Sequence, residues 1–196
     1  MKSFLLAVLA CLPSLALAQT SAASGDETHV PLTFTGGYET NPVDHGRPVI
    51  LIASALKVPP EVFRETFTHV KPAGAGQQPE EAQVRKNKQA LLAGLSPYGV
   101  TDERLNEVSN YYRYNRSQVE MWRTTPASGY ATVSNGVVTG ITITNPGSGY
   151  SSAPTVSVTG LPDVALTATL AFGTDFSKNG SIKEVKVGAL PAPAAP

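Results

Sequence analysis

The sequence predicts an α+β protein in which a small helical bundle is followed by a short antiparallel β-module. From about residue 47 to 124, apolar residues recur at the three- and four-residue spacing of amphipathic helices. After Pro126 the chain changes character: Thr, Ser, Val and Gly dominate, charged residues become sparse, and the apolar period becomes two. We therefore expect the helical bundle over 47–125 and the β-module over 126–188.

Each expected helix begins at a proline or a capping residue and continues with an apolar stripe at helical spacing. The four starts are Pro48, Pro60, Pro79 and Thr101. The stripes comprise Val49, Ile52, Ala53 and Leu56; Phe63, Phe67 and Val70; Val84, Leu91, Leu92 and Leu95; and Leu105, Val108 and Tyr112. The run over 49–52 alone is equally compatible with a strand. We expect the four helices to pack as two helical hairpins.

Alternating runs separated by turn residues predict five strands in the β-module, over 130–133, 137–144, 155–158, 164–172 and 182–187. Asn135-Gly136 lies between the first two runs, and both residue types tolerate the positive φ that a two-residue hairpin requires. A similar pattern recurs around Asn179-Gly180 with a longer loop. The module is therefore interpreted as two copies of a β-repeat.

The two ends of the chain have the composition of segments outside the fold. Residues 1–18 combine an early lysine, a short apolar run and the small residues of Ala16-Leu17-Ala18, which predicts a secretory signal peptide cleaved after Ala18. A lipid anchor at Cys11 is the alternative. Residues 19–46 are expected to form an extended leader that can include one short edge strand, and the Pro/Ala-rich residues 189–196 a disordered tail.

Composition and charge exclude several classes of function. Fifteen Lys and Arg residues balance fifteen Asp and Glu residues, and loss of Lys2 with the leader leaves fourteen against fifteen. Nucleic acid or an anionic membrane surface requires a basic field, so neither is expected as a partner. Because Cys11 is the only cysteine, the exported chain would have no thiol chemistry, and no cofactor is expected. After the leader, no segment is long and apolar enough for a transmembrane helix.

The segment 145–160, NPGSGYSSAPTVSVTG, contains the order Gly-x-Gly-Tyr, a short spacer and Pro-x-Val. It resembles a β-repeat of phage tail fibres and of many bacterial surface or exported proteins, and the likeness covers about 129–188. In such a repeat the glycines permit a sharp corner, Tyr150 covers that corner, and Pro154 returns the chain to an edge strand. The second copy lacks the tyrosine, so the array is expected to end here.

Two further segments carry a second resemblance. Residues 41–48, NPVDHGRP, and 108–114, VSNYYRY, are similar to an uncharacterised family of exported bacterial proteins that join such a bundle to such a β-module. The resemblance implies an envelope or secreted location, and it implies no activity.

Catalytic and metal-binding candidates are few. Asp44 precedes His45, and a carboxylate beside an imidazole can orient a general base; the alternative is a loop in which Asp44 caps a helix. The three histidines, His29, His45 and His69, lack the local spacing of metal ligands. A site assembled in space from His45, His69 and Glu65 stays open, with solvated or core histidines as the alternative.

A third group of candidates combines aromatic rings with arginines near the end of the helical region. Such a group can bind a glycan or a peptide by stacking and hydrogen bonding. The alternative is that Tyr112 and Trp122 seal the bundle against the β-module while the arginines reach water. The candidates are Tyr111, Tyr112, Arg113, Tyr114, Arg116 and Trp122.

Three functions remain compatible with these patterns. The first is an exported, non-catalytic interaction protein, periplasmic or secreted, that binds a protein or glycan partner. The second is a small exported hydrolase or metal-assisted enzyme with Asp44 and His45 in its site. The third is a structural spacer or assembly subunit.

Overall fold

The structure is a computed structural model that describes residues 26–71, 73, 77–78, 80–113 and 121–188. The signal peptide, Cys11, Tyr114, Arg116 and the Pro/Ala tail lie outside the described residues. Within them the helical elements are η1 (Pro42–Asp44), α1 (Val49–Leu56), α2 (Pro60–Phe67), α3 (Glu81–Leu95), η2 (Ser96–Tyr98) and α4 (Asp102–Tyr111). The strands are β1 (Glu27–Thr35), β2 (Ser128–Ser134), β3 (Val137–Asn145), β4 (Thr155–Val158), β5 (Leu166–Ala171) and β6 (Ser181–Val187).

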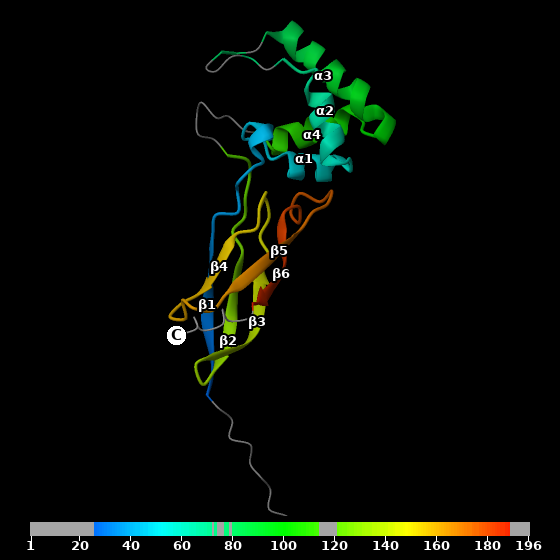
Figure 1. Ribbon diagram of the computed structural model, residues 1–196. Helices are drawn as coiled ribbons and strands as arrows, with labels where there is room; N and C mark the ends of the chain where they lie inside the picture. The colour runs from blue at the N-terminus through cyan, green and yellow to red at the C-terminus, as the bar shows by residue number, and fades with distance from the viewer. Residues whose placement is uncertain (1–25, 72, 74–76, 79, 114–120, 189–196) are drawn as a thin grey trace, which may run out of the picture.

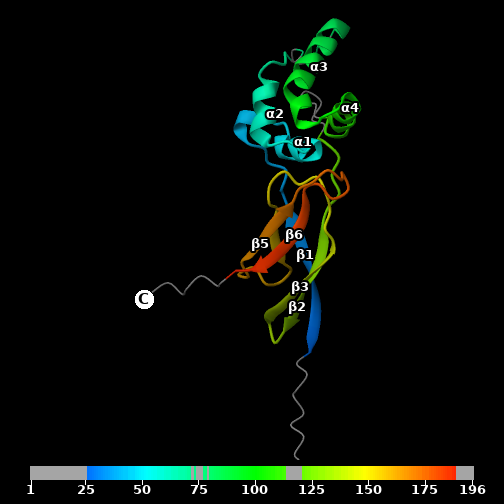
Figure 2. The ribbon, with the colours of Figure 1, turned by 90° about the vertical axis from the view of Figure 1, so that its right-hand side faces the viewer.

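The helices and the strands occupy opposite ends of an elongated molecule (Figures 1 and 2). We refer to residues 42–111 as the helical head and to β1–β6 as the β part. Each has its own apolar core, one centred on Leu51, Leu95 and Val108 and the other on Ala131, Val156 and Ile182. Together with the antiparallel pairing of the strands, this confirms the predicted α+β class.

The first strand corrects the expected order of the parts. The strand order in the larger sheet is β3-β2-β1-β4, so β1 is an interior strand. The expectation that residues 19–46 form an extended leader with at most an edge strand is therefore wrong for β1. Residues 27–31 of β1 pair with β2 and residues 32–35 pair with β4. The helical head is therefore inserted between two strands of one sheet, and the β-module over 126–188 is incomplete without 27–35. Sequence reasoning missed this because strand pairing between residues so far apart leaves no local pattern.

α1, α2 and α4 begin where the sequence predicts, whereas the start predicted at Pro79 lies outside the described residues and α3 begins at Glu81. The side chain of Thr101 accepts a hydrogen bond from the N–H of Arg104 at 3.2 Å, which caps α4. The run over 49–52, which also suited a strand, is helical, and all four residues of its predicted stripe are buried. In α3 only Leu95 is buried and Val84 is 47% exposed, so the predicted stripe of α3 is only partly covered.

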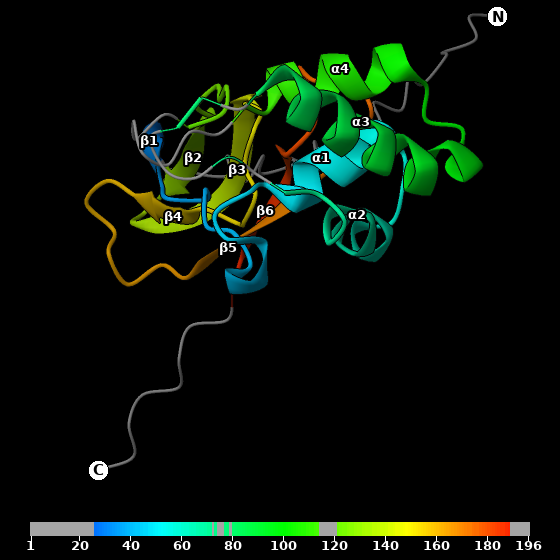
Figure 3. The same ribbon diagram turned by 90° about the horizontal axis from the view of Figure 1, so that it is seen from above.

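The main packing contacts join α1 to α2, α1 to α4 and α2 to α3, as the view from above shows (Figure 3). A close ion pair, Lys88 Nζ to an Asp102 carboxylate oxygen at 2.7 Å, links α3 to α4. The pairing of these helices into two separate hairpins stays a prediction. Among the described residues, no helix combines the length and apolar character that crossing a bilayer requires.

The glycine-rich corner has the geometry expected of it. Gly147 and Gly149 have φ of 64° and 84°, a region that glycine enters without a steric penalty. Tyr150 is buried over the corner, and its hydroxyl accepts a hydrogen bond from the N–H of Ala127 at 2.8 Å. Pro154 then leads into β4 at the edge of the sheet.

A buried asparagine joins the helical head to the β part. Asn179 lies in the loop between β5 and β6, and its Nδ2 donates to the carbonyl of Leu51 and to the hydroxyl of Tyr112, both at 2.8 Å. Its Oδ1 accepts from the N–H of Gly173 at 3.1 Å. Burial raises the pKa of Tyr112 to about 12, although the hydrogen bond from Asn179 opposes the shift.

Because of this raised pKa, the stability of the junction changes with pH in the alkaline range. An unfolded tyrosine titrates near pH 10, so between about pH 10 and 12 the unfolded state binds fewer protons than the folded state. The contribution of Tyr112 to the free energy of unfolding is fully present below about pH 10. It is lost as the pH rises through the pKa that Tyr112 has in the folded state. We expect the stability difference between the wild type and Tyr112→Phe to narrow from about pH 9 to pH 11 in urea unfolding. A stability difference that stays the same from pH 9 to pH 11 would contradict this prediction. Tyr98→Phe, at an exposed position, is the control for the loss of a hydroxyl group.

Candidate functional site

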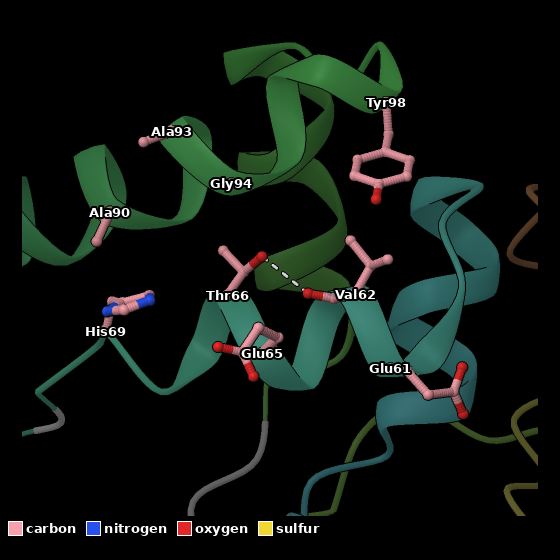
Figure 4. A pocket seen from close by; sticks show the side chains of 9 residues that line it. All are labelled: Glu61, Val62, Glu65, Thr66, His69, Ala90, Ala93, Gly94 and Tyr98. Atoms are coloured by element: carbon pink, nitrogen blue, oxygen red, sulfur yellow. Dashed lines mark hydrogen bonds between the residues drawn. The ribbon is translucent and has the colours of Figure 1, made fainter.

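A groove on the helical head lies between α2 and α3 (Figure 4). It has a volume of about 730 Å³, within the range typical of ligand-binding clefts. Its walls are mainly apolar. The lining residues are Glu61, Val62, Glu65, Thr66, His69, Ala90, Ala93, Gly94 and Tyr98.

Small side chains on α3 create this groove. Ala90, Ala93 and Gly94 share one face of α3, where the helical spacing of three and four places them side by side. A Cβ at Gly94 would lie 2.5 Å from Thr66 Oγ1, so glycine is required for α2 and α3 to approach this closely. Thr66 in turn donates from Oγ1 to the Val62 carbonyl at 2.8 Å. The floor of the groove is thus held by backbone and short side chains, which leaves room above it.

The α2 edge of the groove is acidic. Glu61 and Glu65 are both exposed and lie one turn apart on α2, while His69 follows beyond the end of the helix (Figure 4). Arg64, between the two glutamates, extends to Asp44 and makes only a 3.5 Å contact with Glu61. A ligand in this groove would therefore meet an apolar floor bordered by carboxylates.

Asp44 and His45 do not form a catalytic pair. Asp44 is 5% exposed, and both of its carboxylate oxygens accept hydrogen bonds from Arg64, from Nε at 2.7 Å and from Nη2 at 3.0 Å. These bonds raise the pKa of Arg64. His45 is exposed. It is the residue that ends η1, and its backbone has a φ of 51°. Because the Asp44 carboxylate binds Arg64 of α2, it does not orient the imidazole of His45.

The cap that was expected from Asp44 is made by a different residue. The side chain of Asn41, and not that of Asp44, accepts from the N–H of Val43 at 3.1 Å at the start of η1. A second groove, of about 400 Å³, runs past His45 towards Phe67, whose ring is covered by the guanidinium of Arg47 at 4.2 Å. Asp44 thus stabilises the start of the helical head through an ion pair that joins η1 to α2.

The spatial metal site is not formed. Glu65 and His69 line the α2–α3 groove, whereas His45 lines the second groove. Across the part of the chain that the structure describes, no three His, Cys, Asp or Glu side chains are grouped closely enough to hold a metal ion. The structure therefore contradicts a site made by these three residues.

The aromatic candidates pack at the junction between the head and the β part. Trp122 is 4% exposed and donates from Nε1 to the Gly149 carbonyl at 2.8 Å, and Tyr112 is 3% exposed. Tyr111 is half-buried and stacks on Phe176 with ring centroids 4.2 Å apart. The buried rings do not present faces on which a sugar could stack, which favours the sealing role.

Arg113 is the one remaining candidate of this group that the structure describes. Arg113 is exposed and, with Tyr111, Trp122 and Arg123, borders a cleft of about 450 Å³. The guanidinium of Arg123 lies 5.4 Å from the Tyr111 ring.

Apart from Glu65 and His69, which the sequence analysis considered only as metal ligands, the residues of the α2–α3 groove were not singled out from the sequence. The signal that points to them is the trio of small residues at 90, 93 and 94, on the side of α3 away from its leucines. From the sequence alone such a trio indicates only close helix packing. Comparison with protein-family models, curated proteins and solved structures finds no match for this chain.

Proposed function

We propose that this chain is an exported, non-catalytic interaction protein whose helical head binds a partner protein in the α2–α3 groove. The observation that carries the proposal is the groove itself: an apolar floor of small residues with exposed glutamates along one edge. A groove formed by two helices is a common seat for the apolar face of an amphipathic helix. The leader sequence supports export.

Charge complementarity defines the partner segment. Glu61 and Glu65 border the groove, so a helix that places Leu or Met on the floor and Lys or Arg beside α2 would satisfy both surfaces. A glycan suits the groove less well, because sugar sites combine the faces of Trp, Tyr or Phe with many polar groups, and Tyr98 is the one such residue among those lining it. The β part, in turn, holds the head at the end of an elongated molecule (Figure 1).

Binding of model peptides tests this function. The probes are a fluorescent amphipathic helical peptide of Leu, Ala and Lys and its counterpart with Glu in place of Lys. We expect the basic peptide to bind at least about tenfold more tightly than the acidic peptide, because the carboxylates attract one and repel the other. Glu65→Lys should weaken binding of the basic peptide by a similar factor in fluorescence polarisation.

A matched variant separates the groove from general charge. Glu103→Lys changes the net charge by the same amount at another exposed helical position, in α4, and should leave the affinity unchanged. Ala93→Trp fills the groove without altering charge and should abolish binding. Equal effects of Glu65→Lys and Glu103→Lys, or full binding to Ala93→Trp, would exclude the groove as the site.

A further inference from the structure

The chain contains two Asn-Gly pairs, Asn135-Gly136 and Asn179-Gly180, and their environments in the fold are opposite. In such a pair the backbone nitrogen of the second residue can approach the side-chain amide of the first, because glycine has no side chain to obstruct it. Asn41 and Asn145 precede prolines, whose nitrogen carries no hydrogen to lose. The two Asn-Gly pairs are therefore the candidates for a reaction between an asparagine side chain and the backbone.

The pair Asn179-Gly180 is protected from this reaction. Asn179 is fully buried, and its side-chain amide is held by the three hydrogen bonds at the junction. The N–H of Gly180 donates to the Ala171 carbonyl at 2.9 Å, so the backbone nitrogen is held as well. The two groups can approach each other only when the junction between the helical head and the β part opens.

The pair Asn135-Gly136 is exposed. It forms the turn between β2 and β3, at the end of the β part away from the helical head (Figure 1). Among the described residues, none makes a hydrogen bond with the side chain of Asn135. A Cβ on Gly136 would meet nothing within 4 Å, so the space around the turn is open.

The backbone of this turn is close to the geometry that ring closure requires. Asn135 has a φ of 52° and Gly136 a φ of 78°, the two positive values of a type I′ turn. A five-membered ring between the Asn135 side chain and the Gly136 nitrogen eclipses Cβ with that nitrogen, which sets the ψ of Asn135 to about −120°, its value in a type II′ turn. The two hairpin turns differ by rotation of one peptide plane, and glycine accepts either sign of φ. The ring can therefore form while β2 and β3 stay paired.

We propose that Asn135 is a site of spontaneous deamidation. The Gly136 nitrogen loses its proton and attacks Cγ of Asn135; the new C–N bond closes a cyclic imide, and the side-chain nitrogen leaves as ammonia. Water then opens the imide at one of its two carbonyls, which yields aspartate or isoaspartate. The reaction consumes one water, releases one ammonia and requires no oxidant, reductant or cofactor.

The modification changes the hairpin. Either product places a negative charge in a stretch, 124–162, that contains no Lys, Arg, Asp or Glu. Isoaspartate also adds one carbon to the backbone of a two-residue turn, and the register of a hairpin depends on the length of its turn. Amides of β2 and β3 should therefore exchange with solvent faster in the isoaspartate form than in the unmodified protein.

Peptide mapping by mass spectrometry tests the proposal on folded protein held at pH 6 and at pH 9. The peptide with Asn135 should gain about 1 Da, and at least about tenfold faster than the peptide with Asn179, because only the latter requires opening of the junction. Conversion should be faster at pH 9, since the attacking nitrogen reacts after losing its proton. In urea the two asparagines should convert at similar rates. Asn106, exposed in α4 but followed by Glu107, should stay intact.

Two glycine variants complete the test. Gly136→Ala adds a methyl group next to the attacking nitrogen and should slow conversion of Asn135 at least about tenfold; a loss of stability would act in the opposite direction. Gly160→Ala is the matched control, because Gly160 also has a φ of 78° and open space around it, and it should leave the rate unchanged. The proposal is overturned if Asn135 stays intact in folded protein at pH 9, if Asn179 converts there as fast, or if Gly136→Ala reacts like the wild type.

Discussion

Gly180→Ala is expected to lower the free energy of unfolding by about 3 to 5 kcal/mol, from the left-handed backbone and from overpacking together. Gly180 has φ of 67°, and a Cβ there would overlap the carbonyl oxygen of Tyr150 and lie 2.6 Å from Leu51 Cδ2. These groups belong to the corner and to α1, so neither moves without disturbing the junction. Gly180 also donates its N–H to the Ala171 carbonyl and accepts from the Tyr150 N–H, both at 2.9 Å.

Gly136→Ala isolates the backbone part of this effect, so the difference between the two variants gives the steric part. Gly136 has φ of 78°, but a Cβ there would meet nothing within 4 Å, because it lies in the hairpin turn between β2 and β3. That variant should lose about 1 to 2 kcal/mol from backbone strain alone. Urea unfolding followed by circular dichroism measures both variants. Similar losses for the two would show that the corner relaxes around a methyl group.

Asn179→Leu is expected to cost about 3 kcal/mol or more, although leucine has nearly the same size. The asparagine is fully buried and contacts three polar groups, the Leu51 carbonyl, the Tyr112 hydroxyl and the Gly173 N–H. Without the amide these groups lose their partner in a dry environment, at about 1 to 3 kcal/mol for each group left unsatisfied. Thermal and urea unfolding should both show the loss.

The control for this substitution is Asn106→Leu, at an exposed position of α4 whose amide makes only a 3.4 Å contact with Asp102. It should change stability by about 0.5 kcal/mol or less, as surface substitutions usually do. If Asn179→Leu were as mild, the amide at the junction would not stabilise the contact between the head and the β part.

The sequence alone determined much of the local structure. Helix starts at Pro48, Pro60 and Thr101 were predicted because proline, capping side chains and apolar spacing act within one or two turns. The strands of residues 126–188, the turn at Asn135-Gly136 and the corner at Tyr150 followed from the period of two and from glycine conformations. In each case the residues that decide the structure lie close together in the chain.

Tertiary structure decided which distant residues meet. It made β1 an interior strand, turned Asp44 towards Arg64 instead of His45, and buried Asn179 between the two parts. It also converted the small residues Ala90, Ala93 and Gly94 into a groove, which exists only because α2 packs closely across them. Such contacts depend on the free energy of burying whole surfaces against each other, and a short stretch of sequence carries no record of the surface that it will meet.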